Sequence, residues 1–203
     1  DDLMSILVNP AWEDGETDEA GQALFESVLD LLDWVADLAP TTQAGDLLSS
    51  AVPRGGWVLR FTDRFMTPGS NQLTAYDASE GALYVLFSAV LCMAVSSPPI
   101  FAIDNLDQAI NPRLATRLTA NLSRWLARGG PDRQLLFTTH NPAVLDGLDL
   151  TDDGVRLFAV DRNSDGHTVC RRIQPDPELL ALNQNYPLSR LWLMGRLGAV
   201  PNI

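Results

Sequence analysis

The feature that most constrains the fold is an alternation of strand-like and helical segments between residues 80 and 145. An apolar stretch at 80–95 has helical spacing, and PPIFAID (98–104) is typical of a buried strand. A second helical pattern covers 112–128, and RQLLFTTH (133–140) predicts a second buried strand. Strands that alternate with helices form parallel sheets with right-handed crossovers. We therefore predict an α/β fold built on a parallel sheet.

Shorter elements are predicted on either side of this region. Residues 23–39 carry apolar side chains at helical spacing, whereas 56–66 alternate like a strand and lead into the turn TPGSNQ. The segment 155–173 predicts a hairpin with its turn at Asn163–Gly166, and the tail predicts a short helix near 188–196. The N-terminal part is therefore expected to be a helical and antiparallel segment beside the parallel sheet.

Composition narrows the possible partners. The chain has 203 residues and a net charge of −12, so it is not expected to be a main DNA-binding surface. All 14 basic residues are arginine, and the sequence contains no lysine. Cys92 and Cys170 form neither a disulfide framework nor a zinc spacing, which favours a reduced, cytoplasmic setting. The longest apolar run has 14 residues (82–95), too short to span a membrane.

Three polar residues stand where α/β proteins bind ligands. Ser79 opens the apolar helix, and Asp104 and His140 end the two predicted strands. Ligands of parallel sheets gather at the carboxyl ends of the strands. A helix-opening serine with exposed amides suits a phosphate, and a strand-end aspartate suits Mg²⁺ opposite nucleotide phosphates. His140 would then meet a γ-phosphate or the attacking water.

Each of these positions also has a purely structural interpretation. Ser79 with Glu80 in the first turn is an ordinary helix N-terminus. Asp104 could order a loop, and His140 could simply end a strand. Asn111 is predicted to be the N-cap of the helix at 112–128. The order and spacing of the three motifs therefore carry more weight than any one of them.

Taken together, the motifs resemble those of a known family. ASEGALYVL, IFAIDNLDQAINP and LLFTTHNPAVLD resemble the signature motif, the Walker B motif with D-loop, and the switch histidine of ABC-type ATPases. The likeness is greatest to the RecF/SMC-like AAA-type ATPases of prokaryotic defence and overcoming-lysogenization-defect-like (OLD-like) systems. It covers residues 57–203, including the tail PLSRLWLMGRLGAVPN. It implies a parallel-sheet P-loop NTPase fold, the ABC-type ATPase head.

The resemblance also implies roles for individual residues. In this family two heads dimerise head to tail around two ATP molecules. Asp104 would hold Mg²⁺ as the Walker B acid, His140 would be the switch histidine, and Asn111 would lie in the D-loop region. Three residues of the signature motif would line the ATP bound to the partner head: Ser79, Glu80 and Gly81.

One departure from the family concerns Walker A. That motif needs a lysine on the β- and γ-phosphates, and the sequence has none. In the family, Walker A lies far upstream, before an insertion. We therefore expect residues 1–53 to be the end of a helical insertion with a connector, and residues 54–203 to be the C-terminal part of the ATPase domain. Such a part is not expected to bind ATP tightly by itself.

A second departure concerns the residue after the Walker B acid. The family usually has a glutamate there that polarises the attacking water, whereas this chain has Asn105. An amide cannot accept a proton, so a general-base contribution of about 10²- to 10⁴-fold would be lost. Asp107 is a possible replacement two residues on. We predict slow hydrolysis and a long-lived ATP-bound dimer.

Three functions remain open at this point. The leading one is an ATP-gated dimerisation switch that controls an effector, a nuclease or toxin of antiphage defence, with any DNA sensed elsewhere in the protein. The second is a non-hydrolysing scaffold in which ATP holds an oligomer together, which Asn105 favours. The third is an α/β interaction domain whose motifs are accidental.

Overall fold

The computed structural model describes residues 26–42, 58–94 and 97–199. The expected connector and the expected domain boundary after residue 53 lie outside these residues. The chain divides into two compact units. The first unit contains the described residues up to Phe101 together with Arg124–Leu135, and the second contains the remainder. Each unit is described by itself.

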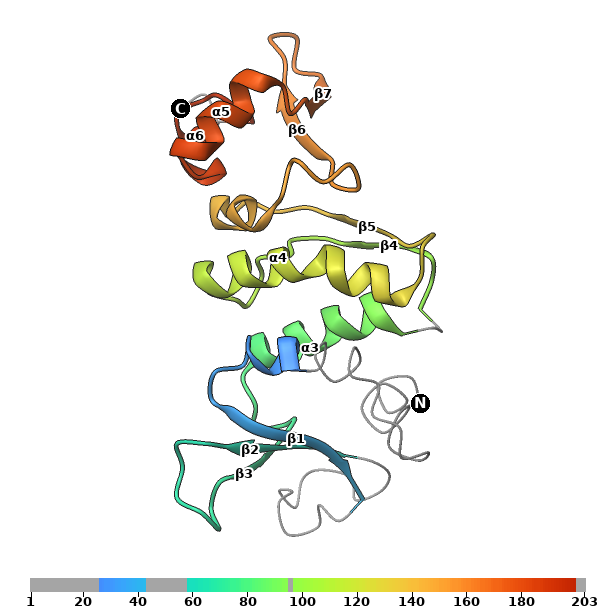
Figure 1. Ribbon diagram of the computed structural model, residues 1–203, viewed down its shortest axis with the longest axis vertical. Helices are drawn as coiled ribbons and strands as arrows, with labels where there is room; N and C mark the ends of the chain where they lie inside the picture. The colour runs from blue at the N-terminus through green and yellow to red at the C-terminus, as the bar shows by residue number, and fades with distance from the viewer. Residues whose placement is uncertain (1–25, 43–57, 95–96, 200–203) are drawn as a thin grey trace. The chain divides into compact units, whose positions relative to one another are not determined.

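An antiparallel sheet with the strand order β1–β2–β3 forms part of the first unit (Figure 1). Its strands are β1 (Val35–Thr41), β2 (Val58–Asp63) and β3 (Gln72–Thr74). The predicted strand at 56–66 is thus confirmed as β2. The turn after it contains Gly69 with a φ of 92°, which glycine adopts without strain.

The predicted helix over 23–39 is wrong for its second half. Only residues 26–29 are helical among those described there, and β1 begins at Val35. The pairing of β1 with β2 shifts register between Val35 and Asp37. A bulge of this kind adds one residue, so that Val35 and Leu38, three apart, are both buried. The bulged strand therefore imitates the apolar spacing of a helix.

The helix α3 (Glu80–Met93) confirms the prediction for 80–95 and also lies in the first unit. Ser79 is its N-cap, because the Ser79 hydroxyl accepts a hydrogen bond from the Ala82 amide at 3.2 Å. Its inner face buries Val85, Ala89 and Cys92 at helical spacing. The helix therefore forms for the reasons that the sequence suggests.

Two short strands and a helix make up the predicted α/β region. The strands β4 (Ile100–Ile103) and β5 (Gln134–Phe137) lie side by side, joined along the chain by α4 (Pro112–Gly129) (Figure 1). The Gln134 amide donates to the Pro99 carbonyl at 2.8 Å, and four residues later Thr138 donates to Ile103 at 3.1 Å. The strands therefore run parallel, and the α/β fold class is confirmed.

The two strands are less buried than predicted. Ile100 is 60% exposed and Leu136 is 58% exposed, whereas Ile103 is buried. The exposed residues alternate along each strand. In the part of the chain that is described, this sheet has only two strands, and one face is left open. The unbroken apolar runs predicted strands that are buried on both faces. In the described residues, only one face of this sheet is covered.

The second unit is completed by the chain after β5. It contains a short 3₁₀ helix η1 (Pro142–Gly147), the hairpin β6 (Leu157–Arg162) and β7 (Thr168–Ile173), and the helices α5 (Pro177–Asn185) and α6 (Leu188–Leu193). The predicted hairpin is confirmed, and its turn is closed by a hydrogen bond from Gly166 to Asn163 at 3.0 Å. The helix α5 was not predicted.

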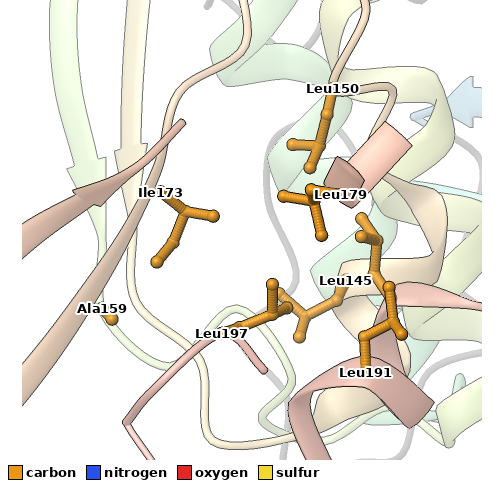
Figure 2. Close-up of a cluster of buried hydrophobic side chains, with 8 residues drawn as sticks. Leu145, Leu150, Ala159, Ile173, Leu179, Leu191 and Leu197 are labelled. Atoms are coloured by element: carbon orange, nitrogen blue, oxygen red, sulfur yellow. The ribbon is translucent and has the colours of Figure 1, made fainter. Parts of the chain in front are cut away.

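A cluster of apolar side chains holds these elements together. Figure 2 shows leucines of η1, α5 and α6 gathered beside Ile173 of β7. The buried members of the cluster are Leu145, Leu150, Ala159, Ile173, Leu179, Leu188, Leu191 and Leu197. Because η1 begins two residues after His140, this cluster anchors the segment that carries the histidine. Within the described residues, no helix is long and apolar enough to cross a membrane.

Candidate functional site

The candidate site lies where β4 and β5 end, in the second unit. Asp104 directly follows β4, and Thr138, Thr139 and His140 directly follow β5. The loops are joined by backbone hydrogen bonds, since Leu106 donates to the Thr138 carbonyl at 2.9 Å. The parallel pairing of the strands thus brings together the two loops that the sequence marks.

The Asp104 carboxylate is exposed and oriented by a threonine. The Thr138 hydroxyl donates to Asp104 Oδ1, and the same hydroxyl accepts from the Asn105 amide at 2.9 Å. The side chain of one residue on β5's loop therefore fixes both the Walker-B-like acid and the peptide that follows it. Sequence reasoning missed Thr138, because its role depends on a neighbour 34 residues away.

Asn105 adopts a backbone conformation that bears on its identity. Its φ is 54°, in the left-handed region, where asparagine is several-fold enriched among non-glycine residues. Ala109, in the same loop, has a φ of 64°. The left-handed backbone therefore gives a structural reason for asparagine at position 105, independent of the absence of a catalytic glutamate. Only the backbone geometry reveals this reason.

Asp107 is half-buried and turned toward the β5 loop. Its Oδ1 accepts hydrogen bonds from the Thr139 hydroxyl at 2.6 Å and from the His140 amide at 3.3 Å. The carboxylate thus holds the backbone of His140, whose side chain is exposed at the end of the strand. The use of Asp107 as a replacement base stays a prediction.

The signature-like residues lie in the first unit and are described apart from the loops above. Ser79 and Glu80 are exposed at the start of α3, and Gly81 is buried. Asn111 lies in the second unit and caps α4, because its Oδ1 accepts from the Leu114 amide at 2.9 Å. The structural interpretations of Ser79 and Asn111 as N-caps are therefore confirmed, and their nucleotide contacts stay predictions.

The residues present fit a magnesium ion shared with phosphates. Among the described residues, no three His, Cys, Asp or Glu side chains gather closely enough to hold a metal by themselves. Mg²⁺ is commonly held by one or two carboxylates, with waters and substrate phosphates completing the shell. Asp104 offers such a carboxylate, exposed and already hydrogen-bonded on one oxygen. The donor set suits a nucleotide-bound metal better than a structural one.

Comparison with known proteins agrees with the motifs. Residues 64–146 match a family model described as "AAA domain, putative AbiEii toxin, Type IV TA system". This segment holds the signature-like, Walker-B-like and histidine motifs together. A comparison with curated proteins gives no match. The family model therefore relates the central part of the chain to AAA-type ATPase domains.

Solved SMC proteins are distantly similar. One comes from work on ATP-driven dimerization and DNA-stimulated activation of SMC ATPases, with 11% identity, a TM-score of 0.43 and coverage of 81% of this chain and 91% of that chain. Another is an Smc head domain with an extended coiled coil, bound to the C-terminal domain of ScpA, from Pyrococcus furiosus. It has 11% identity, a TM-score of 0.47 and coverage of 81% and 38%. Likenesses at this level do not assign a function.

Proposed function

We propose that this chain is the C-terminal part of an ABC-type ATPase head that binds MgATP and acts as an ATP-gated dimerisation switch. The observation that carries the proposal is the pairing of β4 with β5, which sets Asp104 and His140 on adjoining loops. The match of residues 64–146 to an AAA domain supports it. Walker A would be supplied from upstream of this chain.

Each residue has a distinct task in this proposal. Asp104 holds Mg²⁺, which supplies charge neutralisation on the phosphate oxygens. His140 donates a hydrogen bond toward the γ-phosphate or orients the attacking water. Ser79 and the first amides of α3 bind the γ-phosphate of ATP held by a partner head, because a helix N-terminus favours anions. Glu80 and Gly81 shape that same helix start.

Asn105 makes hydrolysis slow. An amide can hydrogen-bond a water but cannot take its proton, so the general-base contribution of about 10²- to 10⁴-fold is absent. Asp107 would have to act through Oδ2, because its Oδ1 already accepts two hydrogen bonds. The ATP-bound dimer is therefore long-lived, and its lifetime sets how long the switch stays on.

The controlled effector is a nuclease or toxin, and the setting is prokaryotic defence in the cytoplasm. The family description, which names a toxin of a type IV toxin–antitoxin system, supports this assignment. The net charge of −12 disfavours direct DNA binding by this part of the protein.

A second function is favoured by one observation. The left-handed φ of 54° at position 105 favours asparagine for structural reasons, whether or not the site hydrolyses ATP. In this second function ATP is a structural ligand that holds an oligomer around the effector and is not hydrolysed. ATP turnover distinguishes the two functions.

The proposal is tested by measuring the mass of the full-length protein in solution, by analytical ultracentrifugation, with and without MgATP. We expect MgATP to produce a dimer, and Asp104→Asn to abolish this shift because one metal ligand loses its charge. Asp153→Asn, at an exposed position of the second unit, is the matched control and should dimerise normally. An unchanged mass of the parent protein in MgATP would contradict the proposal.

A further inference from the structure

Two neighbouring threonines after β5 hydrogen-bond three polar residues of the loop that follows β4. Thr138 contacts Asp104 and Asn105, and Thr139 contacts Asp107. We propose that Thr138 and Thr139 are positioning residues of the nucleotide site, the first for the metal-binding carboxylate and the second for the histidine. This inference rests on the function proposed above. We refer to the two residues as the threonine clamp.

The Thr138 half of the clamp follows from the chemistry of a hydroxyl. A hydroxyl has one proton to donate and lone pairs to accept. Thr138 gives its proton to Asp104 Oδ1 and accepts the Asn105 N–H at 2.9 Å. One side chain thus fixes the carboxylate rotamer and the peptide plane after it. Partners that hydrogen-bond a metal ligand from outside the coordination shell commonly change metal affinity by about 10- to 100-fold when removed.

The Thr139 half acts on the histidine through Asp107. Thr139 donates to Asp107 Oδ1 at 2.6 Å, and the same oxygen accepts the His140 amide at 3.3 Å. The hydroxyl of Thr139 also accepts from the Asn141 amide at 3.1 Å. The backbone amides of the next two residues are therefore both hydrogen-bonded, that of His140 to Asp107 and that of Asn141 to Thr139. The backbone of His140 cannot move away from Asp107 without breaking the hydrogen bond from its amide.

Two residues of the loop after β4 have a left-handed backbone, which explains why the loop needs contacts that hold it. Asn105 and Ala109 both have positive φ, at 54° and 64°. Left-handed geometry is unfavourable for residues with a Cβ, and it persists where surrounding contacts determine it. The hydroxyl of Thr138 bonds directly to the backbone amide of Asn105, the first of these two residues. Loss of this contact should release the loop into more than one conformation.

The test is the Mg²⁺ dependence of ATP binding by the full-length protein, measured by calorimetry. Thr138→Val removes the hydroxyl and keeps the branched shape. We expect the Mg²⁺ concentration for half-maximal binding to rise by about 10-fold. Thr138→Ser restores the hydroxyl and should restore the parent value. If Thr138→Val does not fold, Thr138→Ala carries the same test.

Thr116→Val is the matched control. Thr116 lies in the same unit, and its hydroxyl donates to the Ala143 carbonyl at 2.6 Å and to neither acid. Its loss should leave the Mg²⁺ midpoint unchanged. Hydrogen exchange without nucleotide gives a second readout, and we expect faster exchange in residues 104–111 for Thr138→Val only. For Thr139→Val, we expect a smaller preference for ATP over ADP, because His140 loses its fixed position.

The outcomes separate this inference from the proposed function. If the parent binds MgATP and Thr138→Val has the same Mg²⁺ midpoint and the same exchange rates, the clamp is refuted while the nucleotide site stands. An unchanged ATP preference in Thr139→Val would refute the role of Thr139. If the parent itself does not bind MgATP, both the proposed function and the clamp fail.

Discussion

Arg133 provides a stringent test of how the first unit is held together. It follows α4, and its Nε donates to the Gly129 carbonyl at 2.8 Å. Its Nη1 donates to the Leu91 carbonyl at 3.1 Å, and its Nη2 donates to the Ala94 carbonyl. The last carbonyls of a helix lack intrahelical partners. One guanidinium therefore satisfies the C-terminal ends of both α3 and α4.

The expected cost of removing Arg133 follows from these contacts. A hydrogen bond from a charged group contributes about 1.5–3 kcal/mol, and a partly buried cation at a helix C-terminus adds up to about 2 kcal/mol. These contributions are not additive, because one side chain makes them all. Arg133→Met keeps much of the apolar stem and removes the donors. We expect the free energy of unfolding to fall by about 3 kcal/mol.

Urea unfolding followed by tryptophan fluorescence measures this change, because Trp125 is fully buried in the same unit. Arg156→Met, at an exposed position of the second unit, is the control and should change the free energy of unfolding by less than about 0.5 kcal/mol. A loss below about 1 kcal/mol for Arg133→Met would mean that water replaces the guanidinium at little cost. The assignment of Arg133 as a shared cap would then be wrong.

Three further predictions concern single positions. Gly147→Ala should lower the free energy of unfolding by about 1–3 kcal/mol, because the new Cβ would lie 2.3 Å from the Thr116 carbonyl oxygen. An unchanged urea unfolding midpoint would contradict this packing. Ala109→Gly should raise the free energy of unfolding by up to about 1 kcal/mol, because glycine adopts a φ of 64° without strain, and a decrease would contradict the argument. Burial raises the pKa of the Cys92 thiol from 9.0 to about 12, so mass spectrometry after alkylation should find label on exposed Cys170 and not on Cys92. Because the unfolded thiol ionises first, stability should fall as pH rises from 9.0 toward 12, and labelling of native Cys92 would refute its burial.

The sequence predicted the elements whose signals are local. Ser79 and Asn111 cap α3 and α4 as expected, because capping depends on a few neighbouring residues. The hairpin turn after β6 is likewise encoded by Asn163 and Gly166. The parallel pairing of β4 and β5 followed from the alternation of strands and helices, which makes the position of Asp104 predictable.

Features that depend on distant partners were not predictable. The bulge at Val35 gave a strand the spacing of a helix, and only its pairing with β2 resolves the ambiguity. The left-handed backbone of Asn105 leaves no mark in the sequence beyond the residue type. The contacts of Thr138 and Thr139 span more than 30 residues, so TTH predicted only a strand end.

The most direct test of the account is ATP hydrolysis by the full-length protein with asparagine, glutamate or glutamine at position 105. Asn105→Gln shares the backbone strain of Asn105→Glu and lacks the acid, so the comparison isolates the general base. We predict slow turnover for the parent and for Asn105→Gln, and an increase of about 10²-fold or more for Asn105→Glu. If the parent already hydrolyses ATP as fast as Asn105→Glu, Asn105 is not a brake on the site, and the central claim is wrong.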